Sequence, residues 1–169
     1  MARRRLAAWI LAIAPAVAAC AHSATPTPVT PPVQLTLTRF RTEASSYLSF
    51  SGYTTPTTLV IRDRQQWQSA WTQMYVASPT SLPPPLPDVD FSREMVLLAA
   101  AGNQPSSGYD VIFDSAMEAE GVVTVDVTAR RPGNCGVLTV ITSPVDLARL
   151  PKRDGRVVFR TSPVTMNCR

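Results

Sequence analysis

The chain has 169 residues, a formal net charge of +4 and a single histidine. All three charged residues before position 20 are arginines, so the chain from residue 20 onward carries a net charge of only +1. A remainder of about 150 residues is the size of one globular domain. Its near-neutral charge gives no electrostatic reason to expect nucleic-acid binding.

The N-terminus combines the features of an export signal with a cysteine. Residues 3–5 are arginines, residues 6–14 form an apolar run, and residues 17–19 (VAA) lead into Cys20. This pattern resembles the signal peptides of bacterial lipoproteins, which implies that residues 1–19 are removed and that the Cys20 thiol is acylated. A spanning helix needs about 20 apolar residues, more than this interrupted run offers. An ordinary signal peptide with a chance cysteine is the alternative.

This resemblance sets the expected location and domain order. Acyl chains on Cys20 would anchor the protein in a bilayer of the cell envelope, palmitate being a typical chain. Ala21, where many inner-membrane lipoproteins carry aspartate, favours the outer membrane of a cell that has two. Residues 20–33 then form the lipidated end and a flexible Pro/Thr-rich tether, and residues 34–169 form the domain.

Two cysteines remain after Cys20, and they predict a disulfide. Cys135 and Cys168 form an even pair in a chain expected outside the reducing cytosol. The alternative, a zinc site or a catalytic thiol, would have to use His22 in the tether. No cofactor or metal is expected.

Alternating and continuous apolar segments predict a domain made mainly of strands. The expected strands are residues 35–38, 47–51, 57–61, 95–101, 109–114, 122–130, 136–142 and 156–161. One helix is predicted from an N-cap at Asp63 to about Val76, with Trp67 and Trp71 on its apolar face. Core packing is the expected role of the two tryptophans, and stacking on a ligand is the alternative. The proline-rich residues 78–89 predict a stiff loop.

These elements outline one mainly β domain, a β-sandwich or an open barrel carrying one α-helix. No catalytic triad, carboxylate pair or metal cluster stands at a recognisable spacing, so no enzyme is predicted. A Ser-Lys dyad through Lys152 is formally open, but no serine is marked as its partner. The spacing of Asp88, Asp90 and Glu94 matches no calcium loop, and turn capping is the simpler reading.

Part of the chain resembles a known family. Residues 89–96 (VDFSREMV), Gly102, Ser107-Gly108-Tyr109 and Arg131-Pro132-Gly133 are similar to the PrcB C-terminal domain. That family is named for a lipoprotein subunit of a cell-surface protease complex. The resemblance implies an accessory role in the envelope and brings no catalytic residues with it.

The loop Pro105-Ser106-Ser107-Gly108-Tyr109 is the candidate contact site for a partner. Its glycine can adopt a positive φ, its serines offer hydroxyls, and its tyrosine offers a large contact surface. A tight turn whose tyrosine packs inward is the alternative. The sequence thus predicts a lipid-anchored accessory protein that binds an envelope protein, such as a protease that it stabilises or restrains. The alternatives are a structural or stress-related lipoprotein without a dedicated ligand, or a small-molecule binder.

Overall fold

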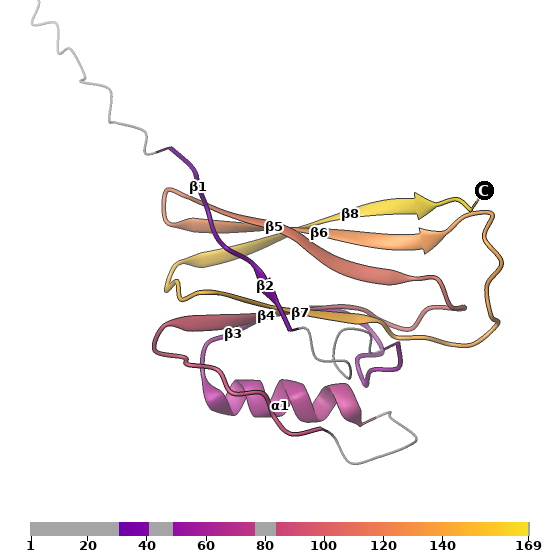
Figure 1. Ribbon diagram of the computed structural model, residues 1–169, viewed down its shortest axis with the longest axis horizontal. Coiled ribbons are helices and arrows are strands. Elements are labelled where there is room, and N and C mark those ends of the chain that lie inside the picture. Colours follow the sequence, from indigo (N-terminus) through magenta and orange to yellow (C-terminus); the bar gives the residue numbers. More distant parts are fainter. Residues whose placement is uncertain (1–30, 41–48, 77–83, 169) are drawn as a thin grey trace, which may run out of the picture.

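Two four-stranded sheets pack face to face, and a helix covers the outer face of one of them (Figure 1). The computed structural model describes residues 31–40, 49–76 and 84–168. Within these residues the chain is a β-sandwich with a single helix, as predicted. The first sheet has the order β1-β5-β6-β8 and the second the order β2-β7-β4-β3. The elements are β1 (Val33–Gln34), β2 (Thr38–Arg39), β3 (Pro56–Ile61), α1 (Arg64–Tyr75), β4 (Glu94–Ala101), β5 (Asp110–Ala119), β6 (Val122–Pro132), β7 (Val145–Pro151) and β8 (Arg156–Met166).

The antiparallel hairpin of β5 and β6 is the centre of the first sheet. Val123, Val125 and Val127 alternate with polar residues and point into the sandwich, as their spacing predicted. The turn at Glu120 and Gly121 has φ values of 51° and 74°, and two-residue hairpin turns of this kind suit the twist of the strands. The hairpin therefore follows directly from local sequence.

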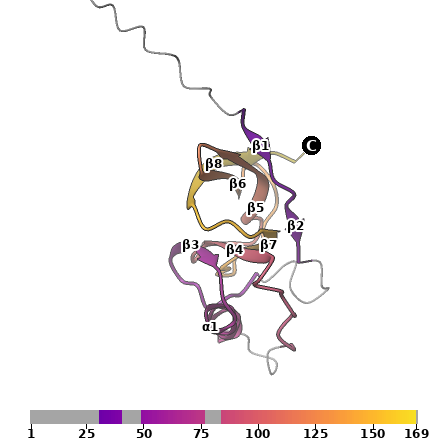
Figure 2. The same cartoon turned by 90° about the vertical axis from the view of Figure 1, so that its left-hand side faces the viewer.

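Strand β4 is buried on both faces because it lies in the middle layer of three. Its odd-numbered residues from Met95 to Ala99 face the first sheet, and its even-numbered residues from Val96 to Ala100 face the helix. Figure 2 shows this order of layers, with α1 beyond the second sheet. The apolar run predicted as a doubly buried strand is therefore correctly assigned.

Helix α1 has the predicted N-cap, because the Asp63 carboxylate accepts the Gln66 N–H at 2.8 Å. Its tryptophans are buried, and each indole N–H donates to a carbonyl of the proline-rich loop: Trp67 to Pro87 and Trp71 to Pro84, both at 2.9 Å. The helix thus packs between β4 and the loop, and the tryptophans belong to the core rather than to a ligand site.

Three predicted strands are wrong in the described residues. The segment 35–38 is a passage between the sheets: β1 before it pairs with β5, whereas β2 at its end pairs with β7. Of residues 49–51, only Phe50 forms a bridge, to Ser143. Residues 136–141 form no strand, and the missed strand is β7, whose alternation is broken by Asp146 and Arg149.

Candidate functional site

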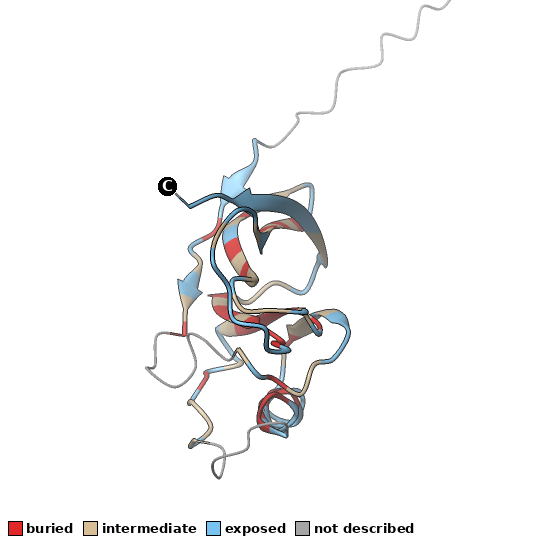
Figure 3. Cartoon of the chain, turned by 90° about the vertical axis from the view of Figure 1, so that its right-hand side faces the viewer, coloured by how far each residue is buried: buried red, intermediate tan, exposed pale blue. Residues whose placement is uncertain are grey.

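The loop 105–109 lies at the end of the sandwich where β4 leads into β5, the end that faces the viewer in Figure 3. It is fastened to residues 136–142. The Ser107 N–H donates to the Leu138 carbonyl at 3.0 Å, and the Leu138 N–H donates back to the Ser107 hydroxyl at 2.8 Å. Thr142 donates its hydroxyl to the Ser106 carbonyl at 2.9 Å. The serines of the loop therefore hold a neighbouring segment.

Gly108 is required where the loop meets that segment. Its φ is +86°, and a Cβ there would lie 3.2 Å from side-chain atoms of Pro132 and Val137. Any other residue would adopt an unfavourable backbone conformation in a tight space. The turn is therefore built to bring the loop against Val137.

The segment 136–141, here called the apolar segment, exposes a row of hydrophobic side chains. Val137, Leu138, Val140 and Ile141 are 39%, 73%, 38% and 66% exposed. No charged residue occurs between positions 132 and 145. Scattered exposed hydrophobic residues are ordinary, but four within five positions concentrate exposed apolar surface in one segment, as is typical of protein contacts.

A disulfide fixes one end of the apolar segment. The Sγ atoms of Cys135 and Cys168 lie 2.03 Å apart and their Cα atoms 4.9 Å apart, which is disulfide geometry. Next to it, the Gly133 N–H donates to the Met166 carbonyl at 2.7 Å, and the Cys168 N–H donates to the Asn134 side chain at 2.9 Å. At the other end, Thr142 forms a two-bond bridge with Gln104. The main chain of the segment is thus fixed at both ends, which lowers the entropic cost of binding.

A second feature, here called the edge groove, opens beside this end between β3 and β8. It has a volume of about 510 Å³ and is mostly apolar. Tyr109 lines it, so the tyrosine of the predicted loop is part of the groove while its serines hold the apolar segment. The other residues that the argument below uses are Ala99, Ala101, Ala129 and Arg131.

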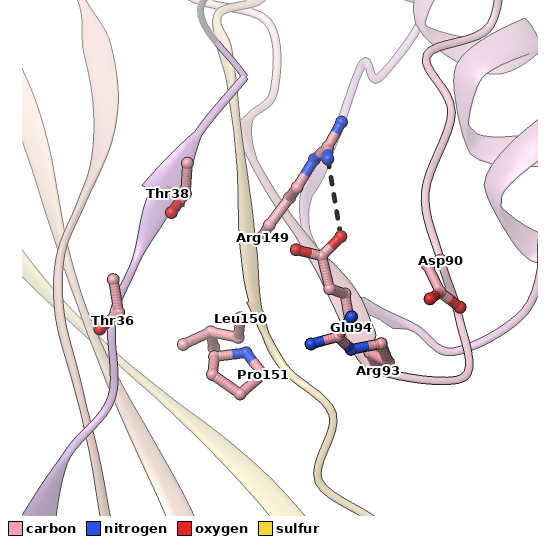
Figure 4. A pocket seen from close by; sticks show the side chains of 8 residues that line it. All are labelled: Thr36, Thr38, Asp90, Arg93, Glu94, Arg149, Leu150 and Pro151. Carbon is pink, nitrogen blue, oxygen red and sulfur yellow. Dashed lines mark ion pairs between the residues drawn. The ribbon is translucent and has the colours of Figure 1, made fainter.

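A third hollow, of about 550 Å³, lies between β2 and the adjoining ends of β4 and β7 and is lined by charged groups (Figure 4). Arg149 is fully engaged there. It pairs with Glu94 at 3.5 Å, donates to the Asp88 carbonyl at 2.9 Å and lies 4.6 Å from the centre of the Phe40 ring. An arginine with this many partners organises the fold rather than binding a ligand.

The three carboxylates whose spacing was compared with a calcium loop, Asp88, Asp90 and Glu94, all have partners within the protein. Asp90 accepts the Ser92 N–H and hydroxyl in a turn, which lowers the pKa of Asp90. Asp88 pairs with Arg64 and Glu94 with Arg149. In the part of the chain that the structure describes, no group of three or more His, Cys, Asp or Glu residues could hold a metal ion.

Asp146 links the two sheets. Its carboxylate accepts the Phe113 N–H of β5 at 2.9 Å and the Arg39 guanidinium of β2 at 3.0 Å. Burial raises the pKa of Asp146, and this effect outweighs the Phe113 hydrogen bond and the Arg39 charge, which lower it. Burial likewise raises the pKa of Asp110, at the mouth of the edge groove. The Asp146 carboxylate therefore joins β7 to both β5 and β2.

Comparison with known families gives a match to part of the chain. Residues 95–151 match the family described as PrcB C-terminal. This stretch of the chain is similar to PrcB C-terminal domains. The match begins in β4 and ends with β7, so it includes both the loop 105–109 and the apolar segment. A PrcB C-terminal domain indicates an accessory role associated with a protease complex. No curated protein and no solved structure matches the chain.

Some predictions concern residues that the structure does not describe, and some features of the structure were not predicted. Cys20, His22 and the tether fall among residues 1–30, so the domain boundaries and the anchor stay predictions. Among the described helices, α1 is too short and too polar to cross a bilayer. Sequence reasoning missed the exposed surface at residues 136–141, because an uncharged run rich in β-branched residues is typical of a buried strand. The edge groove left no sequence signal.

Proposed function

We propose that this protein is an envelope lipoprotein, anchored through an acylated Cys20, whose PrcB C-terminal domain binds another envelope protein and stabilises or restrains it. The family match supports a partner from a protease complex. The observation that carries the proposal is the apolar segment, which is exposed, uncharged and fixed at both ends. Binding would bury its four hydrophobic side chains.

The position of the surface is suited to an anchored protein. Strand β1, where the chain from Cys20 joins the domain, pairs with Glu118 and Met117 close to the turn between β5 and β6. The apolar segment lies at the opposite end of the sandwich (Figure 1). A domain held from its β1 end would therefore present the apolar segment away from the bilayer.

Crosslinking in native envelopes tests the proposed surface. We expect the double variant Leu138→Asp/Ile141→Asp to lose the crosslinked partner, because it places charges on the two most exposed side chains of the segment. Burying two unpaired carboxylates should lower partner recovery at least about tenfold. The matched control is Val33→Asp, a 52% exposed residue at the other end of the sandwich, which should leave recovery unchanged.

Two results would contradict the proposal. The first is equal recovery of the same partner by the wild type and the double variant, with both folded as judged by urea unfolding. The second comes from mass spectrometry of the native protein: an N-terminus at Met1 or an unmodified thiol at Cys20 would remove the anchor. With the purified partner in hand, its lifetime and its peptidase activity with and without the domain distinguish stabilisation from restraint.

A further inference from the structure

The edge groove exists because the inner side chains of the sandwich become smaller toward one end. Where β4 and β6 begin, Met95, Leu97, Val123 and Val125 fill the space between the sheets. Toward their ends the corresponding positions are Ala99 and Ala101 on β4 and Ala129 on β6, all of which line the groove. Short side chains on both sheets leave a space that larger residues would have closed.

The groove lies between two free sheet edges. β8 is the last strand of the first sheet and β3 the last strand of the second, and both lie on the same side of the sandwich (Figure 2). Among the described residues no strand pairs with the outer edge of either. Their outward main-chain N–H and C=O groups can therefore hydrogen-bond an added extended chain, as in β-augmentation.

The charge at the groove favours an anion. Its charged lining residues are Asp110, Arg130 and Arg131. No described carboxylate lies within 4 Å of either arginine, so two guanidinium groups face one carboxylate in the groove. Asp110 interacts electrostatically with Arg130, whereas Arg131 has no acidic group beside it among the described residues. Its Nε donates to the Thr165 hydroxyl at 2.8 Å, which positions the guanidinium while its terminal N–H groups stay available.

We infer that the edge groove binds the carboxyl-terminal end of an extended apolar peptide. The main chain of the peptide would pair with the β8 or β3 edge, an apolar side chain would fill the space above Ala99 and Ala129, and the terminal carboxylate would bind Arg131. A fatty acid would satisfy the arginine and the apolar floor but not the free strand edges, so the geometry favours a peptide. This site is separate from the apolar segment.

The test uses an array of synthetic apolar pentapeptides, each made with a free carboxyl terminus and as the terminal amide. The protein is the chain without residues 1–19 and with Cys20→Ser, so that it is produced unacylated. We expect members of the acid series to bind, and amidation or Arg131→Gln to weaken binding roughly ten- to a hundredfold, the worth of a charged hydrogen-bonded pair. Ala129→Leu should block binding by filling the groove.

The matched control is Arg160→Gln, which removes the same charge from an exposed residue of the neighbouring edge strand β8 and should leave the affinity unchanged. Urea unfolding shows whether the Ala129→Leu variant is folded. If that variant does not fold, the Arg131→Gln variant still tests the inference. The inference is overturned if no acid peptide binds, if acid and amide bind equally, or if Arg131→Gln has no effect. It is also overturned if dodecanoate displaces the peptides and itself binds more tightly. Crosslinking of the Leu138→Asp/Ile141→Asp variant tests the apolar segment, and peptide binding tests the edge groove. Either result therefore leaves the other proposal unaffected.

Discussion

Removing the disulfide should destabilise the domain substantially, because the bond closes a long loop in the unfolded chain. The change is the double variant Cys135→Ser/Cys168→Ser. In the folded state the two ends stay joined by other contacts, including the Gly133 N–H to the Met166 carbonyl at 2.7 Å and the Cys168 main-chain N–H to Asn134. The native structure should therefore survive, and the effect should fall mainly on the unfolded state.

The expected magnitude follows from the separation of 33 residues between the two cysteines. In the chain-entropy treatment, releasing a loop of that length costs about 3.7 kcal/mol of stability at 25 °C. For a domain whose total stability is of the order of 5–15 kcal/mol, this is a large fraction. Removal of the disulfide should accordingly lower the urea midpoint clearly. The slope of the unfolding transition should rise, because the unfolded chain expands.

Equilibrium urea unfolding of the wild type and the double variant measures the difference directly. Reduced wild-type protein provides a second comparison, because it loses the bond without any change of sequence. Agreement between the reduced protein and the variant attributes the effect to the bond itself. A difference below about 1 kcal/mol would refute the reasoning, since it would mean that the unfolded chain is already constrained in the region between the cysteines.

Three further predictions concern the framework around the site. Burial raises the pKa of Asp146, so the folded carboxyl holds its proton to higher pH than the unfolded one. The stability of the wild type relative to Asp146→Asn should therefore fall as pH rises from about 4 through the folded pKa. Urea titrations at several pH values measure this difference, and a rise in relative stability over that range would contradict the prediction. Gly121→Ala should lower the free energy of unfolding by about 1 kcal/mol, because Gly121 has a φ of +74° and a Cβ there would meet no other atom. Gly102→Ala should lower it more, since Gly102 has a φ of +72° and a Cβ there would lie 2.8 Å from Pro56. Equal losses of stability would show that the contact with Pro56 relaxes freely. Trp71→Phe should lose about 1–3 kcal/mol by leaving a carbonyl of the proline-rich loop without its donor, and a neutral result in chemical unfolding would mean that water replaces the indole.

Local patterns predicted the elements whose environment is uniform along their length. The helix was found because its cap and its apolar face are both local, and β6 was found because one of its faces is buried from Val123 to Val127. β7 was missed because Asp146 and Arg149 interrupt its apolar pattern, and the charge of each is paired with a residue of another strand. Residues 136–141 were assigned as a strand on propensity, yet among the residues that the structure describes no strand pairs with them.

The sequence likewise indicated one part of the candidate site but not the other. The sequence marked the loop 105–109 through its glycine and tyrosine, and the loop does lie beside both candidate surfaces. It did not reveal that the serines hold the apolar segment or that Tyr109 lines a groove, because those contacts join residues about 30 positions apart. Local reading can identify a turn, but it cannot tell what the turn rests against.

The sequence by itself determined the lipoprotein prediction, the family resemblance, the predominance of strands, the helix with its cap, and the pairing expected of two cysteines. Each of these depends on neighbouring residues or on simple counting. Only the tertiary structure decided which apolar residues stay exposed and where the sandwich remains open. Both depend on which strands become neighbours, and strand neighbourhood is set by the packing of the whole chain rather than by any one segment.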